Sequence, residues 1–220
     1  MAEKRKWAEL PARLIEGEEL SAQSYLACEE GLPMEGFRFE DGVLDLTGDA
    51  RLDVRGCLFE RCRFPIDLGQ RVDFKDCVFV GCDLSGAQMD QCAFRSCELT
   101  GCRLTGALLS EGLVQYARFS ECAMELCTIG ESKVQDVLLE NCRMDRFAAH
   151  ALRWQRLTLR GCSLRGLEVH GMALKGLDLR SCSIEGITLD PAALRGAIVT
   201  PEQALLLAAL LGLNIKPSEP

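Results

Sequence analysis

A five-residue repeat runs without an insertion from Cys57 to Val199. In each unit a small or apolar residue is followed, two positions later, by a larger apolar residue, as in Cys77 and Phe79. The other three positions are mostly polar, and glycine recurs at the last of them. A period of five matches neither the 3.6 residues per turn of an α-helix nor the two-residue alternation of a strand.

This spacing predicts a solenoid with a square cross-section. Two inward positions separated by one outward residue suit a short extended segment, and the recurrent glycine suits a corner that needs a positive φ. A corner every five residues closes a square after twenty, and stacked squares repeat at the β-strand spacing of about 4.8 Å. We expect a rod roughly 35 to 40 Å long, with an interior filled by side chains rather than an open channel.

Two units break the pattern, at Thr47 to Asp49 and at Asp67 to Gly69, and they are twenty residues apart. We therefore expect local bulges on one face of adjacent coils. The segment Arg153, Trp154, Gln155 and Arg156 has the composition of a basic and aromatic nucleic-acid patch. The repeat places Trp154 at an inward centre, however, so core packing with a local widening of the coil is the preferred interpretation.

Twelve of the 13 cysteines occupy the small inward position, and Cys28 is the exception. Steps of twenty residues predict a ladder along one inner edge, formed by Cys62, Cys82, Cys102, Cys122, Cys142, Cys162 and Cys182. Disulfides would require parallel side chains to turn toward each other, and a metal would require thiolates in a dry core. Buried thiols close to alanine in size are the better explanation, so no metal or cofactor is expected.

The repeat resembles that of the pentapeptide repeat family, whose motif is A(D/N)LXX. The stretch "CDLSGAQMDQCAFRSCELTGCRLTGALLS" matches it closely, with cysteine often in place of alanine. The resemblance implies an all-β fold, a right-handed quadrilateral β-helix, here with an added C-terminal α-helix. The expected organisation is an acidic N-terminal segment or cap over residues 1–30, the β-helix over 31–199 and a capping and dimerisation helix over 200–220. Residues 1–30 could form an amphipathic helix or an irregular cap.

The residues after Val199 carry the signals of a helix. Thr200 suits the N-cap, Pro201 the first helical position, and Gln203 completes a T-x-x-Q capping box before a stop at Gly212. The helix carries more than one apolar stripe, so one face can cover the last coil and another needs a partner. We predict a two-fold homodimer through Leu205, Leu206, Leu207, Leu210 and Leu211. The alternative is a helix that only folds over the coil end.

Charge is distributed unevenly around the predicted square. One face carries five carboxylates against Arg71 alone, namely Asp90, Glu111, Glu131, Glu168 and Asp190. The adjacent face carries three acids and seven bases, namely Lys75, Arg95, Lys133, Arg153, Arg156, Lys175 and Arg195. The net charge of the whole chain is −8, and most of it comes from residues 1–55. This balance argues against direct binding of nucleic acid, which needs a basic surface.

Other features point to a cytoplasmic protein without enzymatic activity. We find no secretory signal and no apolar run of the roughly 18 residues that a membrane helix needs, so no membrane association is expected. No phosphate-binding loop, nucleophile elbow or zinc-type CxxC pair is present. The only histidines, His150 and His170, should stack on adjacent rungs of the acidic face, as solvated side chains rather than zinc or copper ligands. Tyr116, on an outward position, is a possible interface anchor.

The tail "LRGAIVTPEQALLLAALLGLNI" is similar to the tails of the Qnr and MfpA group of pentapeptide repeat proteins. This resemblance implies a DNA-mimicking dimeric rod that binds a type II topoisomerase, DNA gyrase or topoisomerase IV. It would protect the enzyme from poisons such as quinolones or a natural-product toxin. The uninterrupted repeat is closer to the loopless MfpA type. The alternative is a non-enzymatic scaffold, or a secretion or assembly adaptor, that uses residues 1–30 to bind its partner.

Overall fold

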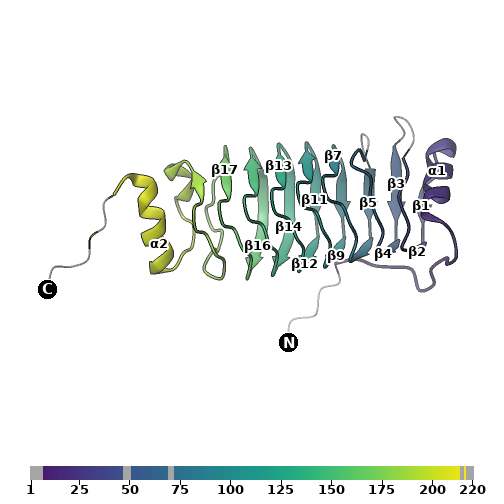
Figure 1. Cartoon of the computed structure of the whole chain (residues 1–220), viewed down its shortest axis with the longest axis horizontal. Coiled ribbons are helices and arrows are strands. Elements are labelled where there is room, and N and C mark those ends of the chain that lie inside the picture. The colour runs from purple at the N-terminus through teal and green to yellow at the C-terminus, as the bar shows by residue number, and fades with distance from the viewer. Residues whose placement is uncertain (1–6, 47–50, 69–71, 214–215, 217–220) are drawn as a thin grey trace.

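The computed structural model describes residues 7–46, 51–68, 72–213 and 216. Successive coils stack along one axis in sequence order, with α1 (Leu20–Glu30) near one end and α2 (Pro201–Ala208) near the other (Figure 1). All strand pairs are parallel, and partners lie twenty residues apart, as for Phe59 with Phe79 and Leu109 with Ile129. The predicted quadrilateral β-helix with a C-terminal helix is confirmed.

Three of the four faces consist of strands. The acidic face is a six-stranded sheet of β7 (Gln88–Asp90), β10 (Leu108–Ser110), β13 (Thr128–Gly130), β15 (Ala148–His150), β17 (Glu168–His170) and β18 (Thr188–Leu189). The basic face contains β1 (Met34–Glu35), β3 (Leu52–Arg55), β5 (Val72–Lys75), β8 (Ala93–Arg95) and β11 (Leu113–Gln115). The next face contains β2 (Arg38–Glu40), β4 (Leu58–Glu60), β6 (Val78–Val80), β9 (Glu98–Thr100) and β12 (Arg118–Ser120).

Two longer strands join the last two of these faces into one sheet. β14 (Lys133–Glu140) and β16 (Arg153–Arg160) each continue around the corner between them. The fourth face has only single bridges between described residues, such as Arg103 with Ala123 and Arg143 with Ser163. This face therefore shows the shortest extended segments, because hydrogen-bonded turns occupy the corner that follows it.

The corner between the fourth face and the acidic face shows why glycine recurs. Gly86 and Gly106 have φ of 69° and 72°, and the Ala107 amide donates to the Leu104 carbonyl at 2.8 Å to close the turn. Such a positive φ has little steric cost for glycine and a real cost for other residues. Leu126 occupies the same corner one coil later with φ of 60°.

The bulge expected at Asp67 to Gly69 has a counterpart in the described residues. Asp67 pairs with Gln88, which is 21 residues away instead of twenty, and the Gln88 amide donates to the Ile66 carbonyl at 2.6 Å. Leu68 is buried, so it fills the inward position that the repeat assigns to Gly69. The other expected bulge, at Thr47 to Asp49, lies outside the described residues.

The core of the N-terminal coils is a stack of phenylalanine rings. The centroids of Phe39 and Phe59 lie 5.6 Å apart, and those of Phe59 and Phe79 lie 5.0 Å apart. All 13 cysteines are free thiols, and the twelve inward ones are buried. Most of their Sγ atoms donate to backbone carbonyls of the neighbouring coil, as Cys102 does to Phe79 at 3.6 Å. Burial raises the pKa of Cys57 to about 12 and that of Cys127 to about 11.

The N-terminal end of the rod is covered by an extended segment and a helix. Ile15 pairs with Phe37 and adds one residue to the edge of the first coil. α1 buries Leu20, Ser24 and Ala27 against the coil end, and the Ser24 hydroxyl donates to the Asp45 carbonyl at 2.9 Å. The described part of residues 1–30 is therefore an extended segment followed by a helix, and this helix is not amphipathic, because Tyr25 and Leu26 are exposed while Ser24 is buried.

The C-terminal end is covered by α2, followed by the 3-10 turn η2 (Ala209–Leu211). The predicted capping box is present, with the Thr200 side chain accepting from the Gln203 amide at 3.2 Å and Gln203 Oε1 accepting from the Thr200 amide at 3.0 Å. Gln203 is buried, and its Nε2 donates to the carbonyls of Leu179 and Cys182 at 2.7 and 2.8 Å. The Gln203 side chain thus caps the N-terminus of α2 and also joins this helix to the last coil by hydrogen bonds.

Candidate interaction surface

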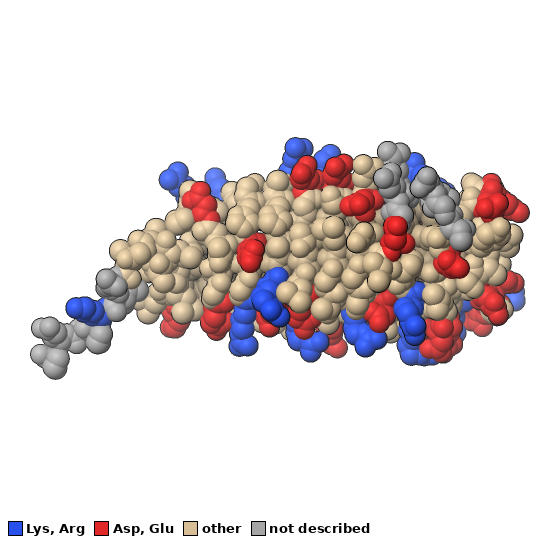
Figure 2. All heavy atoms as spheres, turned by 45° about the horizontal axis from the view of Figure 1, so that its top comes forward, with Lys and Arg blue, Asp and Glu red and all other residues tan. Residues whose placement is uncertain are grey.

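The five carboxylates of the predicted acidic face project from a single sheet. Asp90, Glu168 and Asp190 belong to or directly follow β7, β17 and β18, while Glu111 and Glu131 follow β10 and β13. All five are exposed. The twenty-residue register aligns Asp90 with Asp190 and Glu111 with Glu131, while Glu168 lies at a third outward position of the same face. Figure 2 shows that charged side chains line the rod in rows, with largely uncharged surface between them.

These five carboxylates form no ion pair with another described residue. The fourth face, by contrast, pairs Arg103 with Asp83 at 2.9 Å, and the face that contains β12 pairs Arg118 with Glu140 at 2.7 Å. On these two faces opposite charges on neighbouring rungs thus neutralise each other. The negative charge of the acidic face remains available to a partner.

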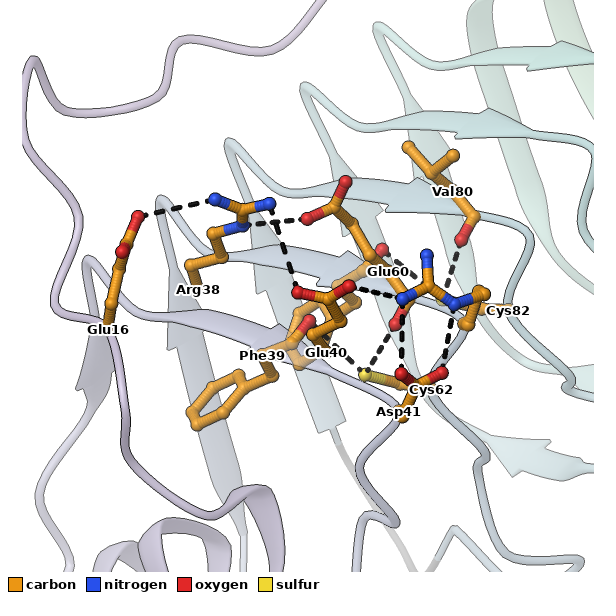
Figure 3. Close-up of polar contacts among 11 residues, drawn as sticks. Glu16, Arg38, Phe39, Glu40, Asp41, Glu60, Cys62, Val80 and Cys82 are labelled. Carbon is orange, nitrogen blue, oxygen red and sulfur yellow. Dashed lines mark hydrogen bonds and ion pairs between the residues drawn. The ribbon is translucent and has the colours of Figure 1, made fainter.

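At the N-terminal coils, in contrast to the acidic face, many acidic side chains form ion pairs (Figure 3). Arg38 donates to Glu60 at 2.7 Å and to Glu16 at 3.3 Å. Arg61 bridges Glu40 and Asp41, with Nε 2.9 Å from an Asp41 oxygen, and this guanidinium lowers the pKa of the Asp41 carboxyl. The N-terminal acids in this cluster are therefore partly neutralised before any partner arrives.

Two members of the acidic face have polar contacts of their own. Glu111 accepts from Gln91 Nε2 at 3.1 Å on the preceding rung. Asp190 caps the 3-10 turn η1 (Pro191–Leu194) by accepting from the Ala192 amide at 2.8 Å. Both contacts orient the carboxylate without removing its charge.

The two histidines lie on this face as expected. The rings of His150 and His170 stack with centroids 5.2 Å apart and an interplanar angle of 4°. Among the described residues, no group of three or more histidine, cysteine, aspartate or glutamate side chains could hold a metal ion. The pair thus adds two stacked imidazole rings to the acidic face.

The basic face carries unpaired charge in its C-terminal half. Lys133, Arg153, Lys175 and Arg195 are exposed, and none forms an ion pair with another described residue. In the N-terminal half, by contrast, Arg95 lies 3.4 Å from Asp73. The rod therefore presents an unpaired acidic row beside an unpaired basic group.

Tyr116 is half-buried rather than projecting freely. It lies in the same corner column as Asp136 and Arg156, which are joined by hydrogen bonds of 2.7 and 2.6 Å. Asp136 is buried, so the bidentate pair compensates its charge. The sequence placed Tyr116 outward, but it could not show that the next two rungs supply an ion pair beside it.

The leucines of the C-terminal end divide into two groups. Leu207 is buried against the last coil, and Leu210 packs against the core. Leu205, Leu206 and Leu211 are exposed by 59, 48 and 61%, as is Leu213 by 56%. Leu213 is absent from the predicted interface, and Leu207 is already covered within the chain. Four exposed leucines therefore lie at the C-terminal end of the rod.

Comparison with known proteins identifies the repeat. Residues 72–148 match the family model described as "Pentapeptide repeat region", and no curated protein matches the chain. This part of the chain is therefore a pentapeptide repeat region. Among the described residues, no helix is long and apolar enough to cross a membrane.

Solved structures of similar fold include trypsin-treated QnrB1, a plasmid-mediated fluoroquinolone resistance protein. It is 17% identical, with 82% of this chain and 97% of that chain covered and a TM-score of 0.41. The pentapeptide repeat protein Rfr23 from the cyanobacterium Cyanothece 51142 is 16% identical, with 53% and 66% covered and a TM-score of 0.24. HetL from Nostoc sp. strain PCC 7120, involved in heterocyst differentiation regulation, is 15% identical, with 74% and 87% covered and a TM-score of 0.23.

Proposed function

We propose that this protein binds a type II topoisomerase, DNA gyrase or topoisomerase IV, in the groove that normally holds duplex DNA, and thereby protects the enzyme from poisons. The unpaired carboxylate row on the acidic face carries this proposal. A positively charged groove that accepts the DNA backbone attracts a rod with one acidic face by charge complementarity. The other faces contribute less attraction because many of their charges are already paired.

The charge density of the acidic face limits how much electrostatic attraction can contribute to binding. Asp90 and Asp190 are five rungs apart, or about 24 Å at the β-sheet spacing. Five carboxylates over this length give about one charge per 5 Å, whereas duplex DNA carries one per roughly 1.7 Å. The acidic face thus has about a third of the charge density of DNA. Tight binding to the topoisomerase therefore also requires shape complementarity and a contact surface longer than one rod.

Dimerisation through the C-terminal end would supply that footprint. Leu205, Leu206 and Leu211 are exposed on the outermost element of the rod, where a second copy could bury them around a two-fold axis. Two rods joined in this way would double the number of acidic rungs. The two-fold axis would also coincide with that of a dimeric topoisomerase, so both halves of the groove could be occupied by equivalent surfaces.

A supercoiling assay with purified gyrase tests the proposal, with and without a fluoroquinolone. We expect micromolar protein to inhibit supercoiling or to reduce poison-stabilised cleavage. A variant with Asp90→Asn, Glu131→Gln and Glu168→Gln should lose this effect by at least about tenfold, since a loss of 1.4 kcal/mol in binding is a factor of ten. A control with Glu19→Gln, Glu29→Gln and Glu30→Gln removes three exposed charges from the N-terminal end and should behave like the unmodified protein.

Two results would defeat the proposal. One is the absence of both protection and inhibition at micromolar protein. The other is an equal loss of activity in the two triple variants, because the effect would then depend on total charge rather than on the acidic face. A scaffold with another partner would then account better for the rod.

A further inference from the structure

The interior of the rod changes character along its length. In the N-terminal coils the small inward position holds mainly cysteine or alanine, so opposite walls approach closely and phenylalanine rings fill the space. From Val137 onward the same position holds bulky residues, among them Phe147, Leu157 and Leu167. Bulky side chains on these inner edges need a wider cross-section than cysteine or alanine does. The long strands β14 and β16 occur in this part of the rod.

A cavity of about 140 Å³ runs along the core of the middle and C-terminal coils. Its lining comes from inward side chains between Met89 and Leu177, which include Phe119, Leu139 and Phe147. These three retain 7 to 8% exposure, whereas Phe59, Phe74 and Phe79 in the tight coils have 0%. The inward side chains of the later coils therefore do not fill their cross-section. Ala149 contributes to the void, because the neighbouring rungs hold Ile129 and Val169 at the same inward centre.

The chemistry of the lining restricts what the cavity can hold. The lining residues are apolar apart from Cys127 and Thr128, and none is charged. Apolar cavities of this size stay dry, and an engineered one of about 150 Å³ in another protein binds benzene and xenon. A carboxylate, sugar or phosphate would lose its hydration here without a compensating partner. The lining spans more than four rungs, or about 20 Å at the β-sheet spacing, which suits a small or slender guest.

We propose that the core of the coils between Met89 and Leu177 forms a binding site for small, uncharged, apolar molecules. This site is independent of the acidic face, because its lining points inward and the carboxylates point outward. Binding adds contacts to side chains that lack neighbours on one side, and such contacts stabilise the folded state in proportion to ligand concentration.

The methionines provide an internal test in the unmodified protein. Met89, Met124, Met144 and Met172 line the cavity, whereas Met34 is buried at the N-terminal end, outside it. With ¹³C-labelled methionine methyl groups, titration with xenon or benzene should shift the four cavity signals along a saturable curve. The Met34 signal should stay constant. Equal shifts of all buried methionines, or no saturable shift, would overturn the proposal.

A matched pair of substitutions tests whether the ligand binds inside the cavity. Ala149→Ile fills the cavity with the residue type found one rung before, while Ala148→Ile makes the same chemical change on the outward side of β15. We expect Ala149→Ile to weaken xenon binding at least about tenfold and to raise the melting temperature, whereas Ala148→Ile should bind xenon normally. Unchanged xenon binding in Ala149→Ile would show that the guest lies elsewhere. If Ala149→Ile does not fold, the methionine titration alone decides.

Discussion

At the scale of single residues, the corner positions decide how much strain each coil carries. Leu126 adopts φ of 60° at a corner where Gly86, Gly106, Gly166 and Gly186 take the same left-handed geometry. A side chain in this region costs about 1 to 2 kcal/mol, and Leu126 does not recover this by burial because it is 48% exposed. Strain at this corner is therefore a local weakness of the solenoid.

Replacing Leu126 with glycine should stabilise the protein. The relief of strain exceeds the extra entropy that glycine brings to the unfolded chain, so we expect a gain of about 0.5 to 1 kcal/mol in the free energy of unfolding. Chemical denaturation measures this change in the free energy of unfolding. The reverse substitution Gly106→Leu introduces the same strain without a steric clash, since the space around Gly106 is open, and should destabilise by a similar amount. A destabilised Leu126→Gly would refute this account.

The buried thiols make stability depend on alkaline pH. Burial raises the pKa of Cys57 to about 12 and of Cys127 to about 11, above the ordinary value of 9.0. Above pH 9 the unfolded chain loses thiol protons that the folded chain keeps, so the stability from this source is complete below pH 9 and falls as pH rises toward 11 or 12. The melting temperature should therefore decline from pH 8.5 to 10.5.

Cys127→Ala provides the control for this pH dependence. Ala87 and Ala107 hold the same inner position on the two preceding coils, so the substitution should cost little at pH 7. It removes one titrating thiol and should make the alkaline decline shallower than that of the unmodified protein. An identical slope in both proteins would show that Cys127 does not contribute.

The cysteine positions could be predicted from the sequence, because a five-residue period fixes which residues point inward. The surroundings of Tyr116 could not, because they depend on Asp136 and Arg156 forming a bidentate pair one and two rungs away. Similarly, the repeat placed Trp154 at an inward centre. In the structure it is half-buried against the core, and its Nε1 donates to the Ala173 carbonyl at 2.9 Å.

At the scale of elements, the C-terminal helix depends on Gln203. A role restricted to the capping box predicts that Gln203→Glu is tolerated, because either side chain can accept from the Thr200 amide. Gln203 Nε2, however, also donates to the Leu179 and Cys182 carbonyls. A glutamate cannot donate there when ionised, so we expect Gln203→Glu to cost about 2 to 3 kcal/mol of stability.

Thr200→Ala is the comparison for this prediction. It removes the capping acceptor and leaves the Gln203 amide donors in place, so its cost should be about 1 kcal/mol. Thermal and urea unfolding of both variants distinguish the two roles. Equal costs for Gln203→Glu and Thr200→Ala, or a Gln203→Glu variant as stable as the unmodified protein, would contradict the double role of this side chain.

The exposed leucines of the same end predict self-association. Leu206 is 48% exposed on α2, and a lysine there would place a charge in an apolar interface. Sedimentation velocity should show a dimer for the unmodified protein and a monomer for Leu206→Lys. Leu32→Lys changes a leucine that is 57% exposed at the opposite end of the rod, and this variant should remain dimeric. A monomeric unmodified protein at tens of micromolar would contradict this prediction.

At the scale of the whole molecule, the sequence predicted the rod and its charge rows because the register never slips between Cys77 and Val199. It predicted neither which charges are paired nor the internal cavity. Pairing depends on side-chain reach across rungs, as between Arg118 and Glu140. The cavity depends on how inward side chains of neighbouring coils pack together, as where Ala149 lies between Ile129 and Val169 at the same inward centre. Both properties belong to the stacked coils rather than to any single repeat.

Competition with DNA tests the central claim most directly. A fluorescent linear duplex bound to gyrase is titrated with this protein, and the anisotropy of the DNA is followed at fixed salt concentration. If the acidic face occupies the DNA groove, the unmodified protein lowers the anisotropy to that of free DNA, and the Asp90→Asn, Glu131→Gln, Glu168→Gln variant needs at least about tenfold more protein. An unchanged anisotropy while the protein binds the gyrase–DNA complex would contradict the claim, because rod and DNA would then occupy different surfaces.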